Sequence, residues 1–422
     1  MPAANGPLIT NRTDPVTGRT LSSRWVQRNT NIDDDNQRLN TRLIGGQAAF
    51  FQRRLIGTFG YRRDEVRLEN RGTARDPATQ EFVVDYGTVA GSRDNAQTRT
   101  LGAVWHVTPA VSLTYNRSNN NALPNNAHRV LPGSARPAAG QGRGEDLGAG
   151  LELFDGRLNF RGTYFTTSGR QESDFRSIIT IVTNRNIRIL NALVNAGQIT
   201  TAAADAHQVN SNGGYSDRES EGWEFRVVAN PTSNWRLQAN YSITDAVESN
   251  IIPEVRAWAD ENIAFWSRTD TAVLTSSNIS IAQEIANLRD DIAAQTSAEG
   301  RGAIGNRRHK ANLFVRHDFS RGPKGLYAGG GWRYQSKMLT GRNLATNLLQ
   351  YSDAIIRTDL LLGYRFRLSS TNRLRAHVQL NISNVLDDDD PMILRRTPDD
   401  LYVRRFSVVE PRTFRLSTTI EF

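Results

Sequence analysis

The chain ends in Pro411-Arg-Thr-Phe-Arg-Leu-Ser-Thr-Thr-Ile-Glu-Phe422, and this closing stretch decides the fold class. Its apolar residues recur at alternate positions, at Phe414, Leu416, Ile420 and Phe422. The positions between them are polar or charged, at Arg415, Ser417, Thr419 and Glu421. Because successive side chains of a strand point to opposite faces, this alternation predicts a two-faced β-strand that runs to the last residue.

The same alternation recurs in the preceding part of the chain. Clear runs cover residues 223–229, 235–243, 310–319 and 374–382. Most runs are about ten residues long, the length that a tilted strand needs to cross a bilayer. A closed barrel satisfies its backbone hydrogen bonds internally, so such strands can lie in a membrane. An apolar stretch of about 18 residues, as a membrane-spanning helix needs, is absent from the sequence.

The connections between these runs alternate between short and long. Short gaps fall at about 52–54, 108–109, 154–156, 230–233, 320–324 and 368–371, and long gaps at about 70–95, 119–143, 170–217, 246–308, 337–353 and 384–409. Bacterial outer-membrane barrels have short periplasmic turns and long external loops, whereas a soluble β-protein has no reason to place every long loop at one end. We therefore predict an all-β, antiparallel transmembrane β-barrel of about fourteen strands, the first near Gly18–Thr30.

Glycines mark two of the short reversals and one strand. Gly156 and Gly325 flank reversals that need a positive φ or a small residue. Three consecutive glycines, Gly329 to Gly331, remove side chains from a predicted strand, which permits curvature or close packing.

Composition and charge fit an outer-membrane barrel and disfavour a nucleic-acid-binding protein. The chain of 422 residues is 38% hydrophobic and 23% charged, with no cysteine and a net charge of +9; its mean hydropathy is −0.52. Phosphate recognition needs a concentrated basic patch, whereas the arginines here are scattered along the strands. We therefore expect no nucleic-acid partner, and read many arginines as lining a polar lumen.

The N-terminal residues do not resemble a signal peptide. Met1 to Pro7 carries no basic region, and no apolar stretch follows it. A protein of the outer membrane needs such a signal. We therefore expect the natural N-terminus to lie upstream and this chain to be a fragment.

Two of the long connections contain helix-like stretches, Ile187–His207 and Ile281–Thr296. In the second, Ile281, Ile285, Leu288 and Ile292 form one apolar stripe at helical spacing. The stripe could belong to a helix that gates or binds a ligand, or it could simply pack inside the loops. We favour packing.

The sequence offers few residues for catalysis or metal binding. None of its six histidines has the spacing of a metal-ligand motif, and no serine and histidine are singled out as a hydrolase pair. Asp387 to Asp390 could bind calcium, but the EF-hand spacing and glycine are missing, so we favour a solvated loop. We predict no enzyme activity, no cofactor and no metal.

Several stretches resemble the barrel of TonB-dependent receptors. The closing part is most similar, with Leu380-Asn-Ile-Ser-Asn-Val-Leu-Asp387, Tyr402 in the following loop, Glu410-Pro-Arg-Thr-Phe-Arg-Leu416 and the terminal Phe422. Further similar stretches are Trp105–Asn116, Leu153–Leu158, Glu219–Glu224 and Lys324–Tyr334. Their order and spacing make the resemblance specific, although each motif alone is weak.

The resemblance implies that residues 1–422 form the C-terminal part of a receptor barrel of about 22 strands, without the plug domain or the first strands. It implies energised uptake of a scarce nutrient, of the siderophore-iron, cobalamin or saccharide type, in the cell outer membrane of a Gram-negative-type bacterium. Implied partners are outer-membrane lipid and lipopolysaccharide, the barrel-assembly machinery, the TonB complex through the missing N-terminal part, and a small nutrient ligand.

The resemblance also assigns roles to parts of the chain. The assembly signal would be Phe414, Leu416, Ile420 and Phe422 on the last strand. The ligand would bind at the extracellular loops, about 170–217, 246–308 and 384–409. A non-energised porin or a surface-binding barrel is the alternative function, and channel conductance would separate it from a plugged receptor.

Overall fold

The computed structural model describes residues 10–13, 20–23, 34–76, 82–122, 139–174, 177–209, 214–297, 299–343, 345–368, 375–396 and 402–421. These residues form two compact units. The first contains residues 1–42 and 64–95, and the second contains residues 43–63 and 96–422. Strands β3 to β5 contribute residues to both units.

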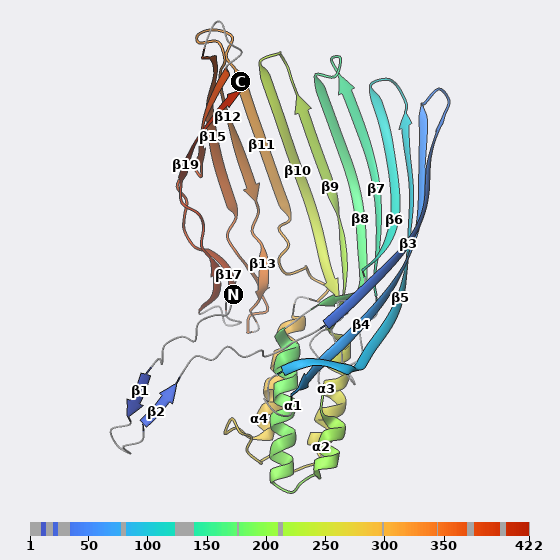
Figure 1. Cartoon of the computed structure of the whole chain (residues 1–422), viewed down its shortest axis with the longest axis vertical. Coiled ribbons are helices and arrows are strands. Elements are labelled where there is room, and N and C mark those ends of the chain that lie inside the picture. The colour runs from blue at the N-terminus through green and yellow to red at the C-terminus, as the bar shows by residue number, and fades with distance from the viewer. Residues whose placement is uncertain are drawn as a thin grey trace. The chain divides into compact units, whose positions relative to one another are not determined.

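The main element of the structure is an antiparallel sheet of thirteen strands, drawn in Figure 1. Its order follows the chain: β3 (Asp34–Phe50), β4 (Leu55–Arg75), β5 (Phe82–His106), β6 (Val111–Ala122), β7 (Gly140–Leu153), β8 (Leu158–Asp174), β9 (Gly214–Ala229), β10 (Trp235–Ser249), β11 (His309–Asp318), β12 (Leu326–Gln335), β15 (Ile355–Arg367), β16 (Arg375–Ser383) and β19 (Thr413–Glu421). Each strand therefore pairs with its neighbour in sequence, as an up-and-down barrel wall requires. Strands β3 and β19 are the two edges of this sheet.

The sheet has one strand fewer than the sequence pattern predicts. Within the predicted first strand, Gly18–Thr30, only Thr20–Ser23 is described as strand, β2. It pairs with β1 (Thr10–Thr13) in a separate two-stranded sheet. Four-residue strands are too short to span a bilayer, which is consistent with their place outside the large sheet.

The predicted connection at about 70–95 is much shorter in the structure. Strand β4 continues to Arg75 and β5 begins at Phe82. Between these strands, within the first unit, Glu65 forms ion pairs with Arg67 at 3.0 Å and with Arg93 at 2.7 Å. The polar residues of this segment led to the prediction of a loop. They are compatible with strands, because strands that extend beyond a bilayer can carry charge on both faces.

Five of the predicted short turns are confirmed, and glycine serves two of them; most of the turn predicted at 368–371 lies outside the described residues. Gly156 has φ +80° between β7 and β8, and Gly325 has φ +97° before β12. Both values lie in the left-handed region that glycine adopts without strain. A Cβ atom at Gly325 would also lie 2.0 Å from the carbonyl oxygen of Arg365, so this turn packs directly against β15.

The register places apolar side chains on one face of the sheet across several strands. Tyr115 pairs with Leu147, Leu147 with Tyr164, and Tyr164 with Trp223. We call this side of the sheet the apolar face and the opposite side the polar face. Large apolar side chains on this face are exposed, including Leu147 at 60% and Leu416 at 69%. A soluble sheet would cover such side chains, so their exposure agrees with the predicted barrel class.

Two long connections contain strands of their own. The connection 337–353 holds β13 (Leu339–Arg342) and β14 (Leu349–Tyr351), which pair with each other. The connection 384–409 holds β17 (Met392–Arg396) and β18 (Val403–Ser407), which also pair. Both are local hairpins outside the main sheet.

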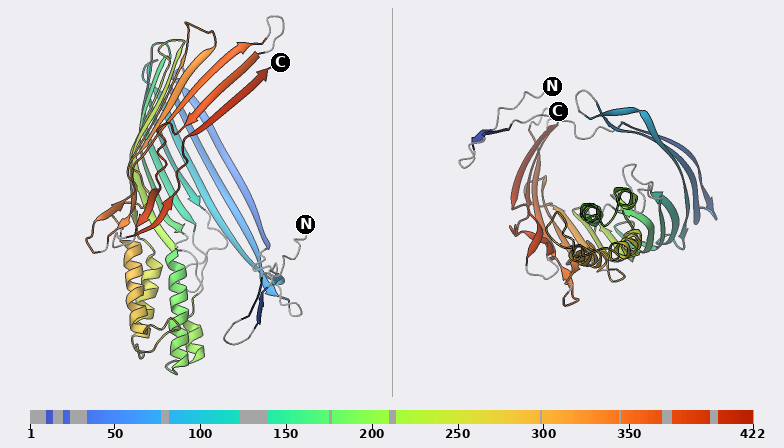
Figure 2. Two further views of the ribbon diagram at one scale, coloured as in Figure 1. Left: turned by 90° about the vertical axis from the view of Figure 1, so that its left-hand side faces the viewer. Right: turned by 90° about the horizontal axis from the view of Figure 1, so that it is seen from below.

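Four helices come from the two longest connections. They are α1 (Ser177–Asn195), α2 (Thr201–His207), α3 (Pro253–Trp266) and α4 (Ile281–Thr296). The bounds of α4 agree with the prediction, but the helix predicted at Ile187–His207 is in fact two helices, and α3 was not predicted. Figures 1 and 2 show the helices together, at the end of β8 to β11 and on the concave side of the curve that these strands follow.

In the part of the chain that the structure describes, none of the helices is long and apolar enough to span a bilayer.

Candidate ligand-binding site

The helices form a small folded module with its own apolar core. The two connections that supply them are separated by strands β9 and β10. Apolar side chains from both pack into one buried cluster, among them Ile179, Val182, Ile189, Leu193, Ile252, Trp258, Trp266, Ile281 and Leu288. We call α1–α4 and this core the helical module. Segments far apart in sequence thus pack around one core at the long-connection end of the sheet.

The stripe predicted on α4 faces this core. Ile281 and Leu288 are fully buried, Ile285 is nearly so, and Ile292 packs against the same cluster. The stripe therefore packs into the module core, which is the alternative that the sequence favoured. It leaves no apolar face on α4 for an external partner.

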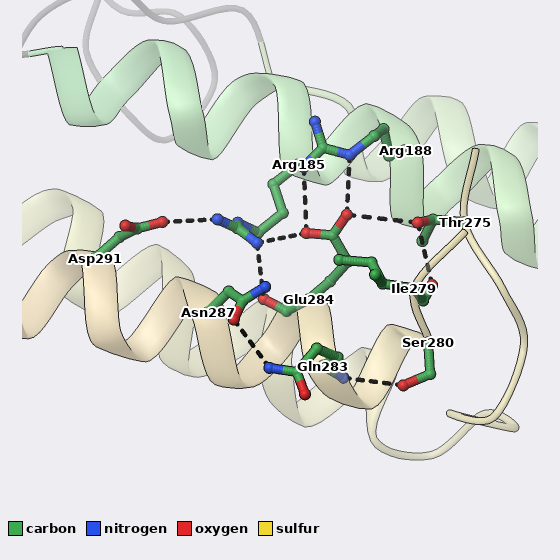
Figure 3. Close-up of polar contacts among 9 residues, drawn as sticks. All are labelled: Arg185, Arg188, Thr275, Ile279, Ser280, Gln283, Glu284, Asn287 and Asp291. Carbon is green, nitrogen blue, oxygen red and sulfur yellow. Dashed lines mark hydrogen bonds and ion pairs between the residues drawn. The ribbon is translucent and has the colours of Figure 1, made fainter. Parts of the chain in front are cut away.

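A buried carboxylate joins helices α1 and α4. Glu284 is fully buried and forms ion pairs with Arg185 and with Arg188, the latter at 2.9 Å between Oε1 and Nε. Arg185 also contacts Asp291 at 2.6 Å, and the Thr275 hydroxyl lies 3.5 Å from Glu284. Figure 3 shows both guanidinium groups of α1 directed at the one carboxylate. Because a buried charge needs such partners, this network fixes how α1 and α4 pack.

The pKa values of two glutamates of the module are shifted in opposite directions. Burial alone would raise the pKa of Glu284, but the hydrogen bonds and charges of Arg188 and Arg185 outweigh it and hold this pKa below its ordinary value. For Glu254, at the start of α3, burial raises the pKa despite backbone hydrogen bonds and the charge of Arg256. The first carboxylate therefore stays ionised, while the second is more easily protonated.

The module is attached to the strand wall through backbone contacts. Ile252 donates its amide to the carbonyl of Tyr215 on β9 at 2.7 Å, and the Tyr215 amide donates to Glu254 at 2.9 Å. Gly214 fits beneath this junction, because a Cβ atom there would lie 2.8 Å from the Glu254 carboxylate. Ile252 has φ +46°, a costly conformation for a β-branched residue. The strain is held in place by the surrounding packing.

A polar groove lies on the polar face of strands β6 to β11. Its cavity volume is about 640 Å³. Cationic lining residues are Arg161, Arg226 and Lys310, and the acidic ones are Asp146 and Glu224. The amide of Asn116 donates to Asp146 at 3.2 Å, which occupies one of the two carboxylates. The groove therefore presents an excess of positive charge, suited to an anionic ligand or to acidic side chains.

A second polar cavity, of about 490 Å³, lies at the long-connection ends of β12, β15 and β16. Arg333 and Asp359 form an ion pair across it at 2.8 Å. Asn384 is buried at its rim and donates to the backbone of Asp388 and Glu410. These bonds hold the last long connection over the strand ends.

The acidic run Asp387–Asp390 borders this cavity, and its first carboxylate has a charged partner. Asp387 accepts from the amide of Arg412 at 2.8 Å and forms an ion pair with its side chain at 2.9 Å. Among the described residues, no group of three or more histidine, cysteine, aspartate or glutamate side chains is placed to hold a metal ion. The run serves here as a loop anchor.

The histidines lie apart in the structure, mostly against aromatic rings. His207 stacks on Phe265 at 4.0 Å, His309 on Tyr241 at 6.2 Å, and His317 lies 4.4 Å from Trp235. His377 contacts the Tyr327 hydroxyl. His128 lies outside the described residues. The structure thus brings no two of these histidines together as a catalytic or metal-binding pair.

The residues predicted as an assembly signal share one strand. Phe414, Leu416 and Ile420 lie on β19 and are exposed at 66%, 69% and 53%. Phe422 lies outside the described residues. Ligand binding at the long connections stays a prediction. Sequence reasoning missed the polar groove, whose lining comes from six strands and becomes visible only in the register.

The order of the strands, the alternation of turn lengths and the two-faced sheet can be compared with known proteins. The sequence matches a family model described as TonB dependent receptor-like, beta-barrel, over residues 7–385. The chain belongs to this family. No protein of curated function matches it by sequence.

Solved structures agree with this family. The ferric-catecholate import receptor Fiu from Escherichia coli K12, in its closed form, is 17% identical with a TM-score of 0.56, covering 91% of this chain and 45% of that one. The ferric preacinetobactin receptor BauA from Acinetobacter baumannii is 13% identical with a TM-score of 0.56, covering 97% and 48%. The siderophore receptor PiuA from the same species is 13% identical with a TM-score of 0.54, covering 96% and 45%.

These likenesses establish the fold of this TonB-dependent receptor-like barrel. The family and the neighbours are receptors rather than enzymes. The chain spans less than half the length of each of these three receptors.

Proposed function

We propose that this barrel serves in the energised uptake of an iron–siderophore complex across the outer membrane. The observation that carries the proposal is the helical module, formed by two long connections at one end of the sheet and adjoining strands whose polar face is basic. A rigid module at the mouth of a lumen can hold a ligand above a polar passage.

The charge of the polar face favours an iron–siderophore complex over cobalamin or a saccharide. Arg161, Arg226 and Lys310 outnumber Asp146 and Glu224 in the groove. Ferric complexes of catecholate siderophores are anionic, whereas cobalamin and most saccharides carry no comparable negative charge. The named functions of Fiu, BauA and PiuA, all siderophore receptors, support the same class.

The proposal includes a location and partners. The long connections would face the exterior and the short turns the periplasm, in a Gram-negative-type outer membrane. Energy would come from the TonB complex. Assembly would use the barrel-assembly machinery, which would read the alternating last strand up to Phe422.

An open porin is the competing function. A barrel with a wet, unobstructed lumen would conduct ions steadily in a planar bilayer, whereas a plugged receptor would be nearly silent. This measurement on the full-length protein separates the two directly.

The test of uptake uses a strain that lacks the gene. Growth on ferric catecholate, ferric hydroxamate, cobalamin and glycan sources is compared with and without the full-length gene, and uptake of radiolabelled ferric catecholate is measured with and without a functional TonB. We expect the gene to restore growth on ferric catecholate alone, and we expect uptake of ferric catecholate to depend on TonB. Restoration by cobalamin or a glycan instead, or uptake that ignores TonB, contradicts the proposal.

A further inference from the structure

A buried arginine joins neighbouring long connections. Arg307 precedes β11 and is only 6% exposed. Its guanidinium donates to the carbonyl oxygen of Ser336 at 2.5 Å and to that of Asp353 at 3.0 Å, at the two ends of the connection that holds β13 and β14. It also donates to the hydroxyl of Ser352 at 3.3 Å. One cation therefore ties the connection before β11 to the connection between β12 and β15.

The fourth acceptor of this guanidinium is a thioether. Nη2 of Arg307 lies 3.1 Å from Sδ of Met392, the first residue of β17. Met392 belongs to the last long connection, 384–409, and its strand β17 lies beside β13, as Figure 1 shows. Through this contact the same cation also reaches a third connection.

The sulfur is a weak acceptor for a cation that is poorly compensated. A thioether accepts hydrogen bonds only weakly. Within the described residues Arg307 forms no ion pair, and Asp353 offers it a backbone carbonyl rather than its carboxylate. Burial lowers the pKa of Arg307, and the charge of Asp353 offsets this only in part. A stronger acceptor in the place of the sulfur would therefore stabilise this cluster.

The thioether side chain can be reached by a small oxidant. Met392 is half-buried and lines the cavity of about 490 Å³ at the ends of β12, β15 and β16. This cavity is much larger than a molecule of hydrogen peroxide. It also leaves room for one further oxygen atom on the side chain of Met392.

We propose that Met392 is a site of oxidation by hydrogen peroxide, and that its sulfoxide binds the buried guanidinium of Arg307 more strongly than the thioether does. A lone pair of the sulfur attacks one oxygen of the peroxide, the O–O bond breaks and an S–O bond forms. The transferred oxygen gives its proton to the departing hydroxide, which leaves as water. Sulfur is oxidised to the sulfoxide and the peroxide is reduced. The new oxygen is a strong acceptor, so oxidation tightens the hold of Arg307 on β17.

The expected direction is the opposite of the usual effect of methionine oxidation. A sulfoxide normally disrupts packing, because it is polar where the thioether was apolar. At Met392 the sulfur already contacts a buried cation beside a polar cavity. Met338 provides the contrast, since it is half-buried and its backbone bridges to Arg307. In the part of the chain that the structure describes, the Met338 sulfur makes no hydrogen bond that oxidation could strengthen.

The test treats the full-length protein in detergent with hydrogen peroxide. Peptide mass spectrometry locates the added oxygen, and hydrogen exchange measures the protection of the β17 amides. We expect an added oxygen on Met392 and slower exchange of the β17 amides, by about fivefold or more, since a charge-assisted hydrogen bond replaces a weak one. Treatment with methionine sulfoxide reductases should restore the parental exchange rate.

Two variants separate Met392 from other effects of peroxide. Met392→Leu has a similar volume and no acceptor, so peroxide should leave its β17 exchange unchanged. The matched control Met338→Leu keeps Met392 and should show the parental slowing. The inference is overturned if Met392 gains no oxygen under conditions that oxidise Met338, or if its oxidation leaves β17 exchange unchanged or faster. It is also overturned if the slowing persists in Met392→Leu.

Discussion

The ring of Tyr327 on β12 lies across Gly363 on β15 and occupies the space of a side chain there. The two residues are paired in the register, and a Cβ atom at Gly363 would lie 2.1 Å from Cζ of the ring. Arg316 stacks on the same ring at 3.9 Å from its centroid, and the hydroxyl donates to Gln379 at 2.5 Å. One aromatic side chain therefore links four neighbouring strands.

Replacing Gly363 by alanine should destabilise the barrel, because the ring cannot stay in place. Overpacking of this kind costs about 1–3 kcal/mol. The matched control is Gly331→Ala on β12, where the nearest atom to a new Cβ is 3.9 Å away. Thermal unfolding in detergent should show a lower midpoint for the first variant and little change for the second. Equal midpoints would contradict the packing described for Tyr327.

Loss of the Glu284 charge should loosen the helical module. Glu284→Gln leaves Arg188 and Arg185 with uncompensated charge, and removing one partner of a buried pair costs about 3–5 kcal/mol. We expect about 2–3 kcal/mol here, because Arg188 is partly exposed and Asp291 still pairs with Arg185. Hydrogen exchange of α1 and α4 amides should accelerate. The exposed pair of Arg308 and Asp245 provides the control, and Asp245→Asn should leave those amides unchanged.

The stability of the module should fall in acid. The pKa of Glu284 lies below its ordinary value of 4.5 in the folded state, so its contribution is present above 4.5 and is lost as pH drops toward the folded pKa. Glu254 has the opposite sign, since its raised pKa makes protonation favour the fold. The protection of the α1 and α4 amides against hydrogen exchange, corrected for the intrinsic pH dependence of exchange, should therefore fall below pH 4.5 in the parent. In Glu284→Gln this acid loss should disappear, and an unchanged acid profile would refute the assignment.

The two faces of the last strand should respond differently to charge. Leu416→Arg would place a cation on the apolar face, at a cost of about 2–4 kcal/mol near the bilayer midplane. Ser417→Arg places the same side chain on the polar face, where water remains. The readout is the amount of heat-modifiable, folded barrel in outer membranes. Normal assembly of Leu416→Arg together with failed assembly of Ser417→Arg would show that the two faces are assigned the wrong way round.

Trypsin added to intact cells should report the topology. Arg268 is exposed in the link between α3 and α4, whereas Arg185 is buried within α1. If the long connections face outside, the first cut in the described residues should follow Arg268 and spare Arg185. Cleavage confined to Arg321 or Lys324, in the short turn before β12, would reverse the proposed orientation.

The helices show where local sequence is sufficient and where it is not. Helix α4 is evident because its apolar stripe has helical spacing and Ser280 caps it, accepting from the Gln283 amide at 3.2 Å. The first half of α1 reads Ser177-Ile-Ile-Thr-Ile-Val-Thr183. Such a β-branched run favours a strand when taken alone. It is helical here because Ile179 and Val182 are buried in the module core.

The sequence by itself determined most of the strands, their two faces and the described short turns, but not the first strand or the strand ends within 70–95. An alternating pattern and a turn glycine act within a few residues, and the difference between water and lipid fixes which face is apolar. Only the tertiary structure decided that two distant connections share one core, with Glu284 meeting Arg185 across 99 residues of chain. No local pattern encodes that choice of partner, because it depends on how the intervening strands β9 and β10 bring the two connections to the same end of the sheet.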